Sequence, residues 1–538
     1  MWMRNPLERA VLAICLLAVV SLAACKVNLT ATSAGRPCVT DADCGSSVIC
    51  QSGVCQAALD RLTPDGGLTP AGGLTPGTPD SGSQPLPTSA YYVSASNGND
   101  SADGLTPASA WKSLARVSNL VLQPSTVVYL SAGDVWMEGF APAGGGSALQ
   151  PVIVDVYPAG GAPAVLNGSN GDAGVVGLML LKFNHVSVRN LSLLNWATAV
   201  YVAGSSDVEL AGVTMADAGY GLEVDNGLPS DQLTVRQSSI LASAVNGLVT
   251  HPSASNVLVE DTVVDGAGNS CITDQSDSSH YTRITVRNCS LIPGSKTDAV
   301  RLSGAQTLID NATVQGATYA CIELAGVKVG KALSNQASGC KYGVLVSGTL
   351  DSGVVDVQRN SVWNSGWGII VAVLTRGTVR VYNNALLGGY LDGGLTTTGM
   401  YLGGFDMDVA NNLVNGIWVN SLSIQGPEVT STAFHFHEDY NAFWQDGGTL
   451  NVFFGTTNES YLTYQGQTGQ GAHSFTGGDP KLTSTNARGP NFHLQASSPL
   501  IDLGTSTPGP FQYNPGCDGG LSNYCGAAPE PGVFEFLP

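Results

Sequence analysis

Several polar residues recur at one position of a repeating pattern, and their chemistry suits the cleavage of a sugar chain. Lys296, Asp298 and Arg301 lie close together, and Asp274 and His251 hold related positions in the preceding repeats. A lysine or arginine can remove the proton next to a uronate carboxylate when a cation such as calcium acidifies that proton. Two carboxylates about 5–5.5 Å or 6.5–9.5 Å apart can instead hydrolyse a glycosidic bond, and a histidine can assist. The residues leave both chemistries open.

Other residues of the same pattern are candidates for substrate binding. Glu223, Asp225 and Glu323 could accept hydrogen bonds from sugar hydroxyls or complete a carboxylate pair, and Tyr401 and Trp418 could stack on sugar rings. A repeating fold must expose some side chain at each such position. Incidental charges on a solvated face are therefore the alternative explanation for the whole set.

The composition excludes some classes of protein. The chain has 538 residues, 43% of them hydrophobic and only 12% charged, with a formal net charge of -19. This is too apolar for a disordered chain, and a nucleic acid backbone would be repelled. We expect a polysaccharide or a cell-surface glycan as the partner, bound by a monomer.

The first segment reads as an export signal. Arg4 and Arg9 precede the apolar run Ala10–Val20, which is too short to span a bilayer comfortably, and the motif Leu-Ala-Ala-Cys follows it and ends at Cys25. This resembles a bacterial lipobox, so we expect residues 1–24 to be removed and Cys25 to carry lipid. Contact with the membrane would be through this anchor alone, at an outer membrane or cell surface. An ordinary secretory signal cut nearby is the alternative.

Two segments separate the signal from the repeats. Residues 25–60 hold four cysteines, which in an exported chain predict two disulfides rather than a zinc site. Residues 61–90 repeat Leu-Thr-Pro among Gly, Asp and Ser, a composition typical of a linker. A further pair near the C-terminus is also expected to form a disulfide. The cysteines in question are Cys38, Cys44, Cys50, Cys55, Cys517 and Cys525.

Residues 91–538 carry an internal repeat. Apolar anchor residues, each in an alternating apolar and polar pattern, recur every 22 to 28 residues, which is typical of a solenoid. The anchors are Val188, Leu210, Val235, Val259, Val286, Ile309, Leu333, Val357, Val381 and Val409. The pattern lacks the helical half of a leucine-rich repeat.

Turns and strands within each repeat define the fold class. Asn stands two residues after the anchor in six of the ten repeats, where left-handed backbone and stacked amide side chains are expected. Two further short strands follow in each repeat. Three strands per coil predict an all-β protein, a right-handed parallel β-helix of about ten or more coils. Cys271, Cys289, Cys321 and Cys340 within the coils are expected to be buried thiols.

The N-terminal segment from Tyr91 to Leu114 resembles the cap of the pectate-lyase-like superfamily, and Val127–Asp134 resembles the first strand that follows it. Its exit module is resembled by three segments near the C-terminus, Asp439–Trp444, Gly478–Pro480 and Asn491–Gly504. The resemblance covers residues 91–538. It implies the β-helix fold and a carbohydrate-active protein, although the superfamily also includes inert structural members.

Two functions therefore stay open. The first is cleavage of a polysaccharide by elimination or hydrolysis, and the second is a non-catalytic surface protein that binds glycans or acts as a spacer. Asp100 and Asp103 could hold calcium, but a tight Asn/Asp/Gly turn explains the same residues and is preferred.

Overall fold

The computed structural model of the chain describes residues 48–51, 54–57, 89–169, 176–224, 227–388, 398–416, 420–424, 435–445, 450–486, 488–506 and 527–534. The chain divides into two units, Met1–Asp80 and Ser81–Pro538. Within the first unit, β1 (Val48–Gln51) and β2 (Val54–Ala57) form an antiparallel hairpin. Cys25, Cys38, Cys44, Cys517 and Cys525 lie outside the described residues, and only the backbone is described at Cys50 and Cys55. The predicted lipidation and the three disulfides predicted outside the coils stay predictions.

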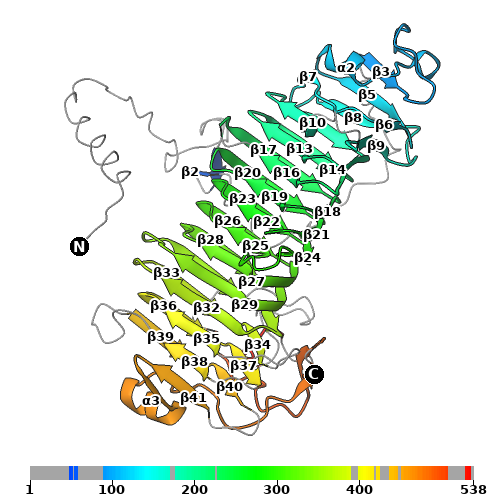
Figure 1. The fold of residues 1–538 in the computed structure, drawn as a ribbon. Helices are drawn as coiled ribbons and strands as arrows, with labels where there is room; N and C mark the ends of the chain where they lie inside the picture. The colour runs from blue at the N-terminus through cyan, green and yellow to red at the C-terminus, as the bar shows by residue number, and fades with distance from the viewer. Residues whose placement is uncertain are drawn as a thin grey trace, which may run out of the picture. The chain divides into compact units, whose positions relative to one another are not determined.

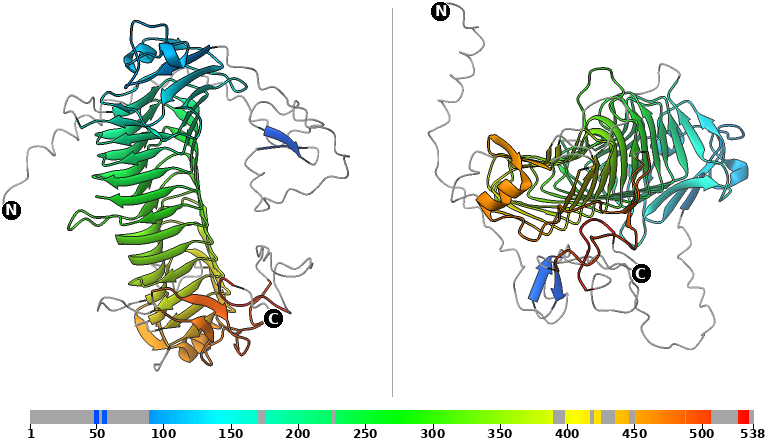
Figure 2. Two further views of the ribbon diagram at one scale, coloured as in Figure 1. Left: turned by 90° about the vertical axis from the view of Figure 1, so that its right-hand side faces the viewer. Right: turned by 90° about the horizontal axis from the view of Figure 1, so that it is seen from below.

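The second unit winds as the predicted parallel β-helix (Figure 1). Its strands stack coil upon coil into a column, seen from the side and from below in Figure 2. One face is a 14-stranded parallel sheet. Its strands are β3 (Ser89–Val93), β5 (Thr126–Ser131), β8 (Val152–Tyr157), β11 (Val186–Arg189), β14 (Ser206–Ala211), β17 (Ser230–Arg236), β20 (Ala254–Glu260), β23 (Ser278–Thr282), β26 (Gln306–Asp310), β28 (Val329–Leu333), β30 (Val354–Gln358), β33 (Thr378–Tyr382), β36 (Asp406–Ala410) and β39 (His435–Asp439).

The other two strands of each coil belong to a continuous 24-stranded sheet that bends round two faces. The second strands are β6 (Val135–Trp136), β9 (Ala164–Asn167), β12 (Leu191–Leu194), β15 (Thr214–Ala216), β18 (Ser239–Ser243), β21 (Val263–Ala267), β24 (Thr285–Arg287), β31 (Ser361–Trp363), β34 (Ala385–Gly388), β37 (Leu413–Gly416) and β40 (Ala442–Trp444). The third strands are β10 (Val176–Leu181), β13 (Thr198–Ala203), β16 (Tyr220–Val224), β19 (Asn246–Thr250), β22 (Ile272–Asp274), β25 (Val300–Leu302), β32 (Trp367–Val373), β35 (Thr398–Gly403), β38 (Asn420–Ile424) and β41 (Asn451–Phe454). β27 (Thr313–Ala325) and β29 (Gln336–Gly348) run through both faces.

The register of the 14-stranded sheet corrects two of the predicted anchors. Tyr281, not Val286, is paired with the anchors Val259 and Ile309 of the two neighbouring coils. Ala332, not Leu333, is paired with the anchors Ile309 and Val357. Pattern analysis favours the larger aliphatic residue, but the interior accepts a tyrosine or an alanine at these points. All the corrected anchors are buried, and each fully buried large apolar side chain contributes roughly 1.5–3 kcal/mol.

Five of the six predicted turn asparagines adopt left-handed backbone, and these five do not form the ladder, whereas Asn335 lacks positive φ and belongs to it. Asn383 and Asn411 have φ of 53° and 55°, and the residue that follows each of them points inward. There the amide of Asn384 donates to Asn412 at 2.9 Å. The buried ladder consists of Asn335, Asn360, Asn384, Asn412 and Asn441. It ends on the buried Glu438, which accepts from Asn441 at 2.7 Å.

The first turns of the unit form a cap. It holds η3 (Pro107–Ser109), α2 (Ala115–Ser118) and the short pair β4 (Val121–Leu122) and β7 (Ala143–Gly144). Asp100 accepts from the backbone N–H groups of Lys112 and Ser113 at 2.8 and 2.9 Å, and Asp103 accepts from Leu105 and Ser109. The carboxylates of the calcium candidate therefore bond to turn donors, and the described residues contain no cluster of three or more metal-ligating side chains.

The far end is closed by β42 (Thr457–Ser460), α3 (Tyr461–Thr468) and the hairpin of β43 (Leu482–Ser484) and β44 (Asn491–Leu494). Figure 1 shows α2 and α3 at opposite ends of the column. Among the described residues, no helix has the length and apolar character needed to span a membrane.

Candidate active site

The third strands carry an outward row of side chains in nearly the predicted order. Successive pairings align Tyr201, Glu223, Val249, Thr273, Arg301, Glu323, Leu345, Ile370 and Tyr401. The row then continues at Ser423 and not at the predicted Trp418. Gly416, with φ of 108°, ends a second strand instead of opening a third one. Trp418 itself lies outside the described residues.

Three ionisable groups meet at the centre of this row. Arg301 forms a close ion pair with Glu323 on the next coil, and its Nη1 lies 3.5 Å from the Asp298 carboxylate. The Asp298 and Glu323 residues are only 4% and 3% exposed, whereas the Arg301 side chain is 43% exposed. Two further donors hold the carboxylates, because the Ala320 N–H donates to Asp298 at 3.1 Å and the Ser347 hydroxyl donates to Glu323 at 2.5 Å.

The charge balance of this cluster favours one bound proton. Two ionised carboxylates with a single guanidinium would leave a net negative charge out of water, which is costly. Burial, a hydrogen bond with Glu323 and the negative charge of Glu323 together raise the pKa of Asp298 to about 8. At neutral pH, Asp298 therefore holds a proton, and the Arg301 charge is balanced by Glu323.

An aromatic ladder continues from the carboxyl pair along the stacked coils. Tyr319 and Tyr342 meet edge to face at 4.8 Å between ring centroids, Tyr342 and Trp367 at 6.1 Å, and Trp367 and Tyr401 at 5.9 Å. The four rings are half-buried and pack on Ala320, Leu345 and Ile370. Lys341 lies over the Tyr342 ring at 4.8 Å. Partly exposed rings beside carboxyl groups are suited to bind the apolar faces and hydroxyls of sugars.

Three of the four rings went unrecognised in the sequence, although a signal for two of them is present. Tyr342 and Trp367 each precede a glycine that opens a third strand. A Cβ at Gly343 would lie 2.6 Å from the Gly368 oxygen, and one at Gly368 would lie 2.4 Å from the Gly399 oxygen. Only glycine fits this close approach between coils. The aromatic residue before it is thereby held in one repeated position on the outer face.

The other predicted site residues are dispersed. Lys296 is exposed on the loop 290–297 that leads to Asp298. His251 lies 4.0 Å from Glu223, but the two residues are two and three coils from Arg301, about 10 and 14 Å at the usual strand spacing. Asp225 lies outside the described residues.

Asp274 faces the interior and is placed away from any substrate. It is fully buried, and it accepts hydrogen bonds from the hydroxyls of Thr250, Ser276 and Ser279, the last two at 2.6 and 2.5 Å. Asp274 follows the outward-facing Thr273 in the same strand, and consecutive residues of a strand face opposite sides of the sheet, so Asp274 faces inward. We interpret Asp274 as a structural carboxylate of the core.

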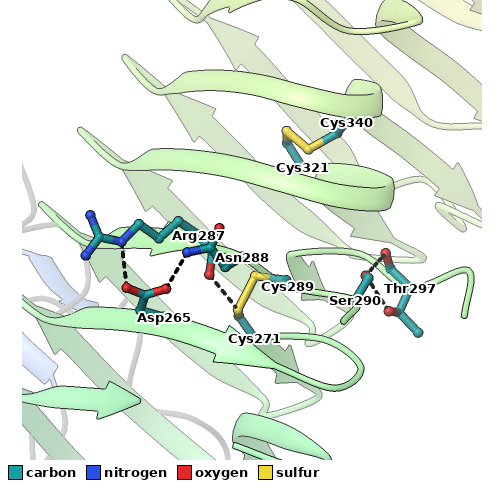
Figure 3. The surroundings of a disulfide bond; sticks show 9 residues. All are labelled: Asp265, Cys271, Arg287, Asn288, Cys289, Ser290, Thr297, Cys321 and Cys340. Carbon is teal, nitrogen blue, oxygen red and sulfur yellow. Dashed lines mark hydrogen bonds and ion pairs between the residues drawn. A yellow bond between two sulfur atoms is a disulfide. The ribbon is translucent and has the colours of Figure 1, made fainter. Parts of the chain in front are cut away.

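The prediction of free thiols within the coils was wrong. Cys271 is bonded to Cys289, and Cys321 is bonded to Cys340, each across neighbouring coils (Figure 3). The Cα atoms lie 5.4 and 5.6 Å apart, which a disulfide requires. Cys271 and Cys321 hold equivalent positions two coils apart, which is too distant for a disulfide, and each instead bonds to a cysteine of the neighbouring coil.

The comparisons with known proteins agree with the fold. The family model described as the right handed beta helix region matches residues 176–326. No curated protein matches the chain in sequence. A GH136 lacto-N-biosidase from Eubacterium ramulus is similar at 15% identity and a TM-score of 0.39, over 67% of this chain and 64% of that one.

Two lyase structures are similar to the same degree. Pectate lyase Pel9A has 14% identity and a TM-score of 0.40, with 83% of this chain and 96% of that one covered. A PL6 family polysaccharide lyase from Pseudopedobacter saltans has 13% identity and a TM-score of 0.40, with 72% and 96% covered. Likeness at this level carries no conclusion about this chain, and the predicted right-handed parallel β-helix is confirmed by the strand pairing and the family model.

Proposed function

We propose that the protein is a glycoside hydrolase whose acid is Asp298 and whose nucleophile is Glu323. The observation that carries this proposal is a buried carboxyl pair, in which one member is protonated at neutral pH, at the start of a ladder of half-buried aromatic rings. A glycosidase needs one protonated and one ionised carboxyl group. An elimination base is harder to find, because Arg301 forms an ion pair with Glu323 and a guanidinium is a poor proton acceptor.

The proximity of the pair favours retention of configuration. The two carboxyl groups interact directly and share Arg301 as a partner, which is nearer to the roughly 5–5.5 Å spacing of a retaining enzyme than to the roughly 6.5–9.5 Å of an inverting one. Asp298 would give its proton to the glycosidic oxygen while Glu323 bonds to the anomeric carbon and the glycosidic bond breaks. Water would then release the sugar from Glu323 and return a proton to Asp298. Arg301, the exposed member of the cluster, would move aside to admit the sugar.

We also propose that the protein is exported and held at a membrane surface through Cys25. The two disulfides of the coils support export, because such bonds persist in oxidising compartments.

The test incubates the purified protein with neutral and acidic polysaccharides and oligosaccharides, with and without calcium. New saturated reducing ends that keep their anomeric configuration are expected, and both Glu323→Gln and Asp298→Asn should abolish them. Asp356→Asn is the matched control, because Asp356 is also buried and ion-paired, to Arg380 on another face. Unsaturated ends would identify a lyase instead. Binding without cleavage would support a glycan-binding surface protein.

A further inference from the structure

The two disulfides lie on either side of the candidate active site. Cys271–Cys289 joins the coil of β22 to the coil of β25, and Cys321–Cys340 joins the coil of β27 to the coil of β29 (Figure 3). No disulfide of the described residues joins the coil of β25 to that of β27. Asp298 and Arg301 lie on one side of that unlinked interface and Glu323 on the other.

One of the two disulfides closes a local irregularity beside the carboxyl pair. In the pairing of β27 with β29, Ala317 lies opposite Cys340 and Ala320 lies opposite Tyr342, so β27 has one extra residue in between. Such β-bulges turn side chains out of register and are common beside active sites. Tyr319, the first ring of the ladder, lies in this bulge. Cys321 follows the bulge directly, and its bond to Cys340 spans it.

The bulge also carries the backbone contacts of Asp298. The N–H of Ala320 donates to the Asp298 carboxylate, and the carbonyl of Ala320 accepts from Ala299 at 2.8 Å. Cys321 comes next in the chain and Glu323 two residues later. The path of the chain at Cys321 therefore determines how closely Glu323 approaches Asp298.

We propose that the Cys321–Cys340 disulfide is a positioning element that holds the bulge and thereby keeps Asp298 and Glu323 close enough to share one proton. This inference rests on the proposed function of the pair. The groups that face Asp298 are Glu323, Arg301 and the Tyr319 hydroxyl, with Lys341 beyond the tyrosine. The disulfide adds no charge to this set and acts through distance alone.

The chain contains its own control. Cys271–Cys289 has a sequence separation of 18, against 19 for Cys321–Cys340, so both bonds restrict the unfolded chain nearly equally. Cys271–Cys289 lies at the base of the loop 290–297 and spans no irregularity of strand pairing. Hydrogen bonds from Ser290 to Thr297 and from Thr318 to Ser295 hold that loop independently.

The experiment compares Cys321→Ala/Cys340→Ala with Cys271→Ala/Cys289→Ala in the full chain. The titration of Asp298 is followed by isotope-edited infrared spectroscopy of the protonated carboxyl group, with Asp298→Asn identifying its band. Hydrolysis is measured over the same pH range. Loss of Cys321–Cys340 should lower the pH at which the Asp298 band is half lost by about one pH unit or more. The pH at which kcat declines on the alkaline side should fall by the same amount. Loss of this disulfide should also lower kcat about tenfold with little change in KM.

Loss of Cys271–Cys289 should leave the midpoint and kcat unchanged, although both variants unfold at similarly reduced temperatures. Equal shifts in both variants, or a shift in neither, would overturn the proposal. Cys321→Val/Cys340→Ala, which fills more of the space, replaces the first variant if its circular dichroism shows that it does not fold. If the wild type hydrolyses no glycan, the proposed function fails, and the infrared midpoints still decide whether the disulfide positions the pair.

Discussion

Glu323 lies directly opposite Arg301 in the parallel pairing of β25 with β27, and the two side chains form an ion pair on the outer face of the sheet. Stacked coils thus bring together residues that are 22 positions apart in sequence. The pairing also brings Glu323 to Asp298, whose backbone position is three residues before Arg301. The candidate site is therefore a product of coil register and not of a local motif.

Removal of either carboxyl group should abolish turnover without unfolding the column. We expect Glu323→Gln and Asp298→Asn each to lower kcat by roughly 10²–10⁴, the usual contribution of a positioned acid or base. Asp356→Asn should retain full activity because Arg380 lies on the opposite sheet. Steady-state kinetics with circular dichroism as a folding check measures this. Undiminished hydrolysis in both site variants would exclude the pair as the catalytic group.

The stability of the protein should depend on pH through Asp298. Its pKa is raised from 3.8 to about 8 in the folded chain, so between these values the folded state binds a proton that the unfolded state has released. The free energy of unfolding must then fall as pH rises across this window. Urea midpoints at pH 5, 6, 7 and about 8 should decline less steeply in Asp298→Asn than in the wild type. Other groups, including the buried Glu438, contribute the same pH dependence to both proteins and therefore do not affect the difference between them. Identical slopes would contradict the raised pKa.

The aromatic ladder should contribute to binding and not to chemistry. Trp367→Ala and Tyr342→Ala should raise KM about three- to tenfold, the equivalent of one lost aromatic contact, with kcat largely kept. Tyr129→Ala is a suitable control, because its ring stacks on Tyr92 at 5.2 Å on another sheet near the cap. A KM that responds equally to all three substitutions would argue against a sugar-binding role.

The asparagine ladder should be essential for stability. Asn384→Ala removes the oxygen that accepts from both the backbone and the side-chain N–H of Asn360. It also removes the side-chain donor to Asn412 and to the buried Val357 carbonyl, while the backbone N–H of residue 384 still donates to Asn412. With about 1–3 kcal/mol for each orphaned group, we expect a loss of several kcal/mol in unfolding free energy. Asn383→Ala next to it changes only a left-handed turn residue and should cost about 1 kcal/mol. Denaturant unfolding of both variants measures the difference, and equal losses would refute the ladder's importance.

The repeat period, the three strands per coil and the outward row of side chains could be predicted from the sequence. The alternation of apolar and polar residues and the spacing of the repeats are visible in one sequence. The same pattern misplaced two anchors where the interior accepts Tyr281 or Ala332 instead of a large aliphatic residue. The direction of Asp274 could have been deduced, since the outward Thr273 precedes it in the same strand. Asp298 lies outside the regular strand, so the alternation alone could not show its contact with Glu323.

The disulfides were missed for a geometric reason. Cysteines at equivalent positions, such as Cys271 and Cys321, are separated by the coil spacing, whereas the true partners occupy different positions around one corner. Cys271 precedes a third strand and Cys289 follows a second strand of the next coil. Only the path of the turn brings them together, and no pattern of residue types encodes that path.

Each ring of the aromatic ladder after Tyr319 comes from a separate coil, while the carboxyl pair comes from the two coils before them. Duplication or loss of one repeat beyond β29 would therefore lengthen or shorten the aromatic ladder by one ring and leave the carboxyl pair unchanged. The gene of such a protein could adapt to longer or shorter glycans by unequal recombination of whole repeats. On the proposed function, chain-length preference and cleavage chemistry would be set by different coils.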